Sequence, residues 1–159
     1  MRDGDIRVKT DIKYRALYND MKKERAITDF HDLFFVCTCI GFSANERNCI
    51  ERGDDRFWSN TISPTEWSCY YAMMMKLNDL ELSSICDDRQ VIATMQEYSN
   101  AGIELLIQDF LGDYLLPGTR DSEPQLDPSL AETLPVDFLY YILEQSEANN
   151  WVTLHGRYS

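Results

Sequence analysis

The sequence has few residues that break regular structure and no long apolar stretch. It contains 7 Gly and 5 Pro in 159 residues, which excludes collagen-like and low-complexity chains. Because no run of about 18 apolar residues occurs, we expect no membrane span. The first residues, 1–5, are polar and lack the apolar segment of a secretory signal. The five cysteines are odd in number, which is typical of a reduced compartment, so we expect a cytoplasmic protein.

The motifs that mark common catalytic and cofactor sites are also missing. The chain has no G-x-S-x-G motif, no P-loop and no G-x-G-x-x-G,. His31, Cys37, Cys39 and Cys49 match no common zinc spacing,. Cys37 and Cys39 are two positions apart, so on a helix their side chains point away from each other. We therefore predict a protein that is not an enzyme and holds neither a cofactor nor a metal ion.

Positive charge is scarce in the last two thirds of the chain. The net charge is −12. Residues 1–60 carry 11 Lys/Arg and 11 Asp/Glu, whereas residues 61–159 carry 4 and 16, so the whole excess lies in the second part. This negative field repels phosphate backbones. It indicates a solvated acidic surface, a basic protein partner, or mimicry of DNA.

The N-terminal segment is locally basic and offers an alternative function. Residues 1–25 carry a net charge of +3, which suits a DNA-contacting regulator, although the interleaved acids also suit an ordinary helix surface. The candidate phosphate contacts are Arg7, Lys9, Lys13, Lys22 and Lys23.

Apolar residues recur at helical spacing and predict an all-α fold, a compact bundle of four to five helices. Thr28 is the expected N-cap and Gly41 the expected C-cap of the second helix. Ser63-Pro64-Thr65-Glu66 forms a capping box, which predicts the start of the third. The expected helices span residues 11–24, 28–41, 63–77, 87–111 and 136–149. We predict a helical core domain over 1–112, a linker over 113–134 and a C-terminal helical arm over 135–159 that docks on its own domain or on a partner.

Aromatic residues make up 12% of the chain, and several lie in the C-terminal arm. Tyr and Trp combine apolar area with a polar group and are enriched where proteins meet. The candidate interface residues of this arm are Phe138, Tyr140, Tyr141, Ile142 and Trp151.

A predicted helix contains Phe30, Leu33, Phe34 and Gly41-Phe42, and Trp58 comes after it. The segment Glu97-Tyr98-Ser99-Asn100-Ala101-Gly102-Ile103-Glu104-Leu105-Leu106 follows later in the chain. This combination resembles small proteins encoded beside bacterial DNA phosphorothioation (Dnd) genes, whose late signature reads approximately E-Y-A-N-G-G-[IL]-E-[IL]-L. The resemblance covers about residues 7–112. Independently of that resemblance, the small residues of the segment predict a close helix crossing, either within the chain or in a partner groove. Its candidate residues are Glu97, Tyr98, Asn100, Gly102 and Glu104.

The resemblance implies a cytosolic bacterial protein of an anti-phage or anti-plasmid operon, with no catalytic residue to transfer. Our leading hypothesis is a non-enzymatic accessory subunit that binds a larger ATPase or effector subunit. Lamassu-type systems, which pair a coiled-coil ATPase with small helical subunits, offer a setting by genomic analogy. The DNA-contacting regulator and the acidic DNA mimic that inhibits a nuclease remain as alternatives.

Overall fold

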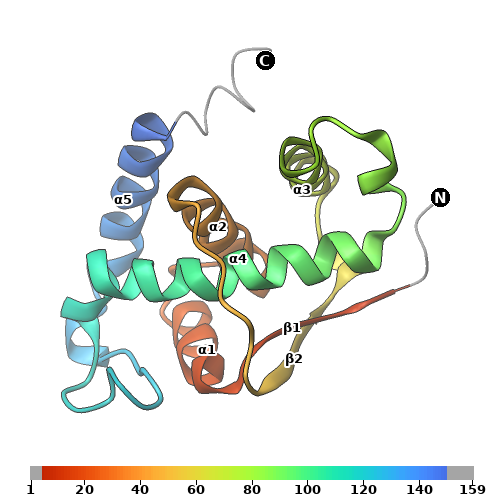
Figure 1. Cartoon of the computed structure of the whole chain (residues 1–159). Helices are drawn as coiled ribbons and strands as arrows, with labels where there is room; N and C mark the ends of the chain where they lie inside the picture. The colour runs from red at the N-terminus through yellow and green to blue at the C-terminus, as the bar shows by residue number, and fades with distance from the viewer. Residues whose placement is uncertain (1–4, 150–159) are drawn as a thin grey trace.

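The computed structural model describes residues 5–149 and is mostly helical, with a small sheet (Figure 1). Its α-helices are α1 (Arg15–Lys23), α2 (Phe30–Ala44), α3 (Pro64–Leu77), α4 (Asp88–Asp109) and α5 (Leu134–Ala148). Short 3-10 helices η1 to η5 span Ile12–Tyr14, Ser59–Thr61, Leu82–Ile85, Leu111–Tyr114 and Pro128–Leu130. The long helix α4 runs across the molecule, with α5 packed near its C-terminal end and α3 on the other side of α2 (Figure 1).

The all-α prediction is wrong in one respect, because two strands form an antiparallel ribbon. Strand β1 (Arg7–Asp11) pairs with β2 (Gly53–Trp58), and the register shifts at a bulge after Val8. Residues 11–14, expected to begin the first helix, instead end β1 and form η1. The two strands are far apart in sequence, so no local turn signal announces their pairing.

Helices α2 and α4 cross with almost no space between their backbones. A Cβ atom on Gly102 would lie 1.7 Å from the carbonyl oxygen of Cys37, and one on Gly41 would lie 2.1 Å from that of Tyr98. Gly41 therefore serves packing rather than helix termination. Helix α2 continues to Ala44 and ends at Asn45, which adopts the left-handed conformation with φ 56°,.

The beginnings of α2 and α3 are fixed by side-chain caps. Ser63 and Glu66 form the predicted capping box at α3, with Ser63 Oγ accepting from the Glu66 N–H at 3.2 Å. Helix α2 begins one residue later than expected, because Asp29 rather than Thr28 is the N-cap and the Asp32 carboxylate accepts from the Asp29 N–H at 2.9 Å. These caps satisfy N–H groups that the helices leave free.

Residues 113–134, the predicted linker, fold back onto the rest of the chain. Leu115 and Leu126 are buried and pair in an isolated antiparallel bridge. The Leu126 N–H donates to the Asp20 carboxylate of α1 at 3.0 Å. Leu126, Ala131 and Leu134 belong to the same apolar core as the helices before them, so this segment holds α5 against its own domain.

Candidate protein-interaction surface

Helix α5 is anchored within the chain by one apolar face. Leu134, Phe138 and Tyr141 are buried, and their spacing of three to four residues places them on one side of the helix. The ring of Phe110, the residue after α4, stacks on Phe138 with centroids 5.9 Å apart and on Tyr141 with centroids 4.9 Å apart. Helix α5 therefore docks on its own chain through Leu134, Phe138 and Tyr141.

A hydrogen bond next to these rings orients the first turn of α5. The Tyr114 hydroxyl donates to the Asp137 carboxylate at 2.7 Å. This hydrogen bond lowers the pKa of Asp137, because it stabilises the ionised carboxylate. Asp137 thus stays negatively charged at neutral pH at the edge of the helix.

The opposite face of α5 is apolar and open to solvent. We call Val136, Leu139, Tyr140 and Leu143 the α5 stripe. Their exposed fractions range from 48% to 64%, and their spacing of i, i+3, i+4 and i+7 places them in one row on the side away from Phe138. Soluble helices usually carry polar residues on the solvent side, and a contiguous apolar patch there is typical of an interaction site.

Of the interface residues that the sequence predicts, the structure buries some in the chain's own core and leaves others exposed. Phe138 and Tyr141 are buried in the chain's own core, so their prediction as partner contacts is corrected. Ile142 is partly buried against that core, whereas Tyr140 is exposed. Trp151 lies outside the described residues. Val136, Leu139 and Leu143 were not predicted as contacts, although their spacing in the sequence forms a second apolar row on the opposite face of the same helix,.

The segment of the chain that contains the α5 stripe is acidic and has no basic residue. Residues 121–149 contain seven acids, Asp121, Glu123, Asp127, Glu132, Asp137, Glu144 and Glu147, and no Lys, Arg or His. On α5 itself, Glu144 and Glu147 are exposed. The α5 stripe is thus an apolar row on a helix whose exposed charged residues are acidic.

The signature residues of α4 serve contacts within the chain. Glu97 accepts from Arg47 at 2.8 Å, and the Asn100 amide donates to the backbone oxygens of Asn48 and Cys49. Glu104 accepts from the Tyr14 hydroxyl and lies 3.8 Å from Lys13 Nζ. Tyr98 is buried behind this polar face. Together with Gly102, these residues hold the loop before β2, η1 and α2 against α4, which is the intramolecular form of the predicted crossing.

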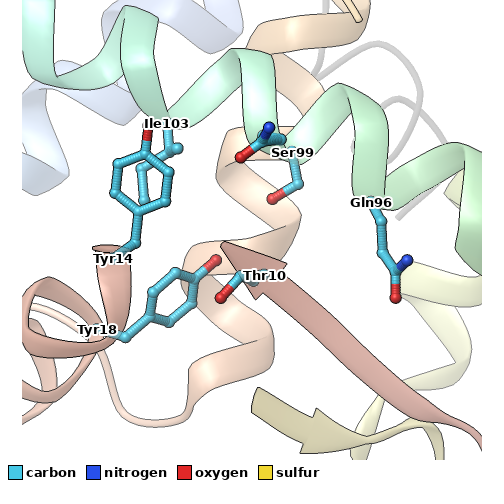
Figure 2. Close-up of a pocket in the computed structure, with 7 residues that line it drawn as sticks. Thr10, Tyr14, Tyr18, Gln96, Ser99 and Ile103 are labelled. Carbon is cyan, nitrogen blue, oxygen red and sulfur yellow. The ribbon is translucent and has the colours of Figure 1, made fainter. Parts of the chain in front are cut away.

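A narrow space lies beneath the polar face of α4. Figure 2 shows it between Thr10 of β1, the rings of Tyr14 and Tyr18, and Gln96, Ser99 and Ile103 of α4. The space leaves no room for a water molecule. Burial raises the pKa of Tyr18 well above its usual value, so this hydroxyl stays neutral. The arrangement serves packing between the ribbon, α1 and α4.

The basic residues of the N-terminal segment are spread over several contacts. The Arg7 guanidinium lies 3.7 Å from the centre of the Trp58 ring and 3.8 Å from the Asp55 carboxylate. The Lys9 backbone N–H donates to Gln96 at 2.8 Å. Lys22 lies over the Phe30 ring, while Lys23 is exposed in the last turn of α1. Carboxylates near Arg7 and Lys13 reduce the positive potential available to a phosphate backbone.

His31 contacts acidic side chains, whereas two cysteines of α2 are buried. His31 Nδ1 is 2.9 Å from Glu66 Oε1, joining the first turns of α2 and α3, and Asp29, His31 and Asp32 have potential ligand atoms within 4.8 Å of one another. Cys37 and Cys39 are buried, and burial raises the pKa of both thiols. They therefore remain protonated, and only the thiolate is an effective nucleophile.

No family model, curated protein or solved structure matches this chain. Within residues 5–149, no helix is both long enough and apolar enough to cross a membrane.

Proposed function

We propose that this chain is a non-enzymatic accessory subunit that binds a larger protein through the α5 stripe. The observation that carries the proposal is the two-sided character of α5. Leu134, Phe138 and Tyr141 already anchor the helix in its own core, so the exposed stripe is not needed for folding. The exposure of Leu139 and Leu143 to water is unfavourable in free energy, and this cost is removed only when another molecule covers the two side chains.

The size of the α5 stripe indicates what it contributes to binding. A fully buried large apolar side chain gains about 1.5–3 kcal/mol over an exposed one, so covering four half-exposed side chains supplies roughly 4 kcal/mol. Association costs several kcal/mol. The stripe is therefore the centre of an interface that includes further contacts.

The setting of the proposal comes from the resemblance of residues 97–106 to the Dnd-associated proteins. That resemblance supports a prokaryotic anti-phage or anti-plasmid complex with an ATPase or effector as the larger subunit. Direct DNA contact receives less support, because Arg7 and Lys13 lie near carboxylates. A DNA mimic receives less support as well, since an apolar row interrupts the acids of α5.

The mass of the assembled protein tests the proposal. Substituting both Leu139→Lys and Leu143→Lys keeps good helix formers on α5 and removes the apolar row. Purified from the cells that encode it, the native chain should elute in an assembly well above its own 18.5 kDa, and the double variant should elute as the free chain.

A matched control carries the same two substitutions at another exposed site. Leu80 and Leu82 are 71% and 67% exposed in and near η3, so Leu80→Lys with Leu82→Lys makes the same charge change away from α5. This control should assemble like the native chain. Assembly of the α5 variant at the native level, with an unchanged thermal melt, contradicts the proposal.

A further inference from the structure

The partner element that fits the α5 stripe follows from its spacing and from the charges beside it; this inference rests on the proposed function. Val136 and Leu143 lie seven residues apart, so the row is about 10 Å long along the helix axis. Spacing of i, i+3, i+4 and i+7 forms a straight ridge of side chains. Such a ridge packs into the groove between side-chain rows of a second helix.

The charge of the surrounding chain restricts which helix fits. Asp137, Glu144 and Glu147 lie on α5 itself, and no Lys, Arg or His occurs between residues 121 and 149. A partner with acidic flanks would bring like charges together at the rim of the contact, whereas Lys or Arg flanks would pair with these carboxylates.

The same charges argue against a second copy of this chain as the occupant. If two α5 stripes faced one another, each would present Glu144 and Glu147 to the acids of the other. Neither copy has a basic residue in this segment to relieve the repulsion. In a closed dimer through this face, the acidic residues of the two copies would therefore repel one another, which is unfavourable at low salt.

We infer that the α5 stripe binds an amphipathic helix of the partner whose apolar row is flanked by Lys or Arg. The contact is a two-helix pair in which the leucines of both rows interdigitate. Basic side chains at the rim steer the approach and pair with the acids of α5. Helix-in-groove recognition of this kind uses apolar anchors spaced one helical turn apart.

A pair of designed peptides tests the inference without knowledge of the natural partner. Each capped peptide has about 18 residues, long enough to form helix, with one leucine row; one has lysine flanks and the other glutamate flanks. Titration into the isotopically labelled full chain, followed by amide NMR, gives the affinity and the site of each. The lysine peptide should shift signals of residues 136–143 and bind at least about tenfold more tightly than the glutamate peptide.

Variants and salt complete the test. Leu139→Lys with Leu143→Lys should abolish binding of the lysine peptide, whereas Leu80→Lys with Leu82→Lys should leave its affinity unchanged. Raising the salt from about 0.05 M to about 0.5 M should weaken binding severalfold, because the rim charges become screened.

Several results would overturn the inference. Equal affinity for the two peptides would show that the α5 stripe does not select a basic helix. NMR shifts outside α5 would show that the peptide binds elsewhere. If the protein without peptide has twice the monomer mass, a second copy occupies the α5 stripe. If the NMR signals of residues 136–143 shift when residues 150–159 are deleted, the chain's own C-terminal end occupies it. Each of these can occur while the α5 variant still loses its assembly, so failure of the helix inference is distinguishable from failure of the proposed function.

Discussion

Substituting Gly102 with alanine gives the sharpest test of the fold, because helix propensity and packing predict opposite signs. In the interior of a helix, alanine is more favourable than glycine by about 1 kcal/mol. At this position, however, the new Cβ would lie 1.7 Å from the Cys37 carbonyl oxygen and 2.6 Å from its carbonyl carbon. Both atoms are backbone, so no side-chain rotation relieves the overlap.

The magnitude follows from the distance that the helices must move. Ordinary contact to a Cβ begins at 3.4 Å, so the backbones of α2 and α4 would have to separate by more than 1 Å at the crossing. That movement loosens the contacts of the apolar core that both helices share. Overpacking against a rigid neighbour costs about 1–3 kcal/mol, and more when backbone must shift. After the gain in propensity, we expect Gly102→Ala to lower the free energy of unfolding by about 3 kcal/mol.

Urea unfolding followed by circular dichroism measures this difference. The matched control is Ala93→Gly, since Ala93 is exposed on the same helix. It should cost about 1 kcal/mol, which calibrates propensity alone in α4. A Gly102→Ala variant as stable as the native chain, or more stable, would refute the tight crossing.

The remaining predictions concern a partly buried ion pair, the anchor of α5 and the α5 stripe. The Arg15 hydrogen bond lowers the pKa of Asp54, and Asp54 lies 2.8 Å from the buried Arg56. Asp54→Asn should therefore cost about 2 kcal/mol at neutral pH. Because the pKa of Asp54 is lower in the folded than in the unfolded chain, its stabilising contribution is fully present above the unfolded pKa of about 3.9 and is lost as pH falls through the folded pKa. Urea unfolding should therefore show a smaller difference in the free energy of unfolding between the native chain and the variant at pH 3 than at pH 7. An equal difference at both pH values would contradict this role of Asp54. Phe110→Ala should lower the free energy of unfolding by about 2–4 kcal/mol. It should also raise the rate of amide hydrogen exchange at residues 138–141 more than in α3. An equal increase in both helices would show that Phe110 does not anchor α5. Leu139→Lys with Leu143→Lys should remove the assembly with less than about 0.5 kcal/mol change in stability, as expected for exposed positions, measured by chromatography and urea unfolding.

Helices with strong local signals were predictable from the sequence. The capping box Ser63–Glu66 marks the start of α3, and its observed bounds Pro64–Leu77 agree closely with the expected 63–77. Helix α4 was expected over 87–111, and the structure has one continuous helix from Asp88 to Asp109 that includes Gly102. Local hydrogen bonding and periodicity determine both elements, so they can be read without knowledge of distant residues.

Elements that depend on distant partners were not predictable. The β1–β2 pairing joins residues 42 to 51 positions apart. From the sequence alone Gly41 is typical of a C-cap, and only its contact with α4 shows that it serves packing. The α5 stripe lies between these cases. Its spacing is visible in the sequence, but which of the two apolar faces of α5 remains exposed is decided by the stacking of Phe110 on Phe138 and Tyr141.

Hydroxyl-radical footprinting of the free and assembled chain reports the solvent exposure of individual side chains, and it therefore measures whether a partner covers α5. Oxidation of Leu139, Tyr140 and Leu143 is compared with that of Leu80 and Leu82, which are similarly exposed in the free chain. We expect severalfold protection of Leu139, Tyr140 and Leu143 in the assembly and unchanged oxidation of Leu80 and Leu82. Equal oxidation of the α5 side chains in both states would contradict the claim that this protein works by presenting α5 to a partner.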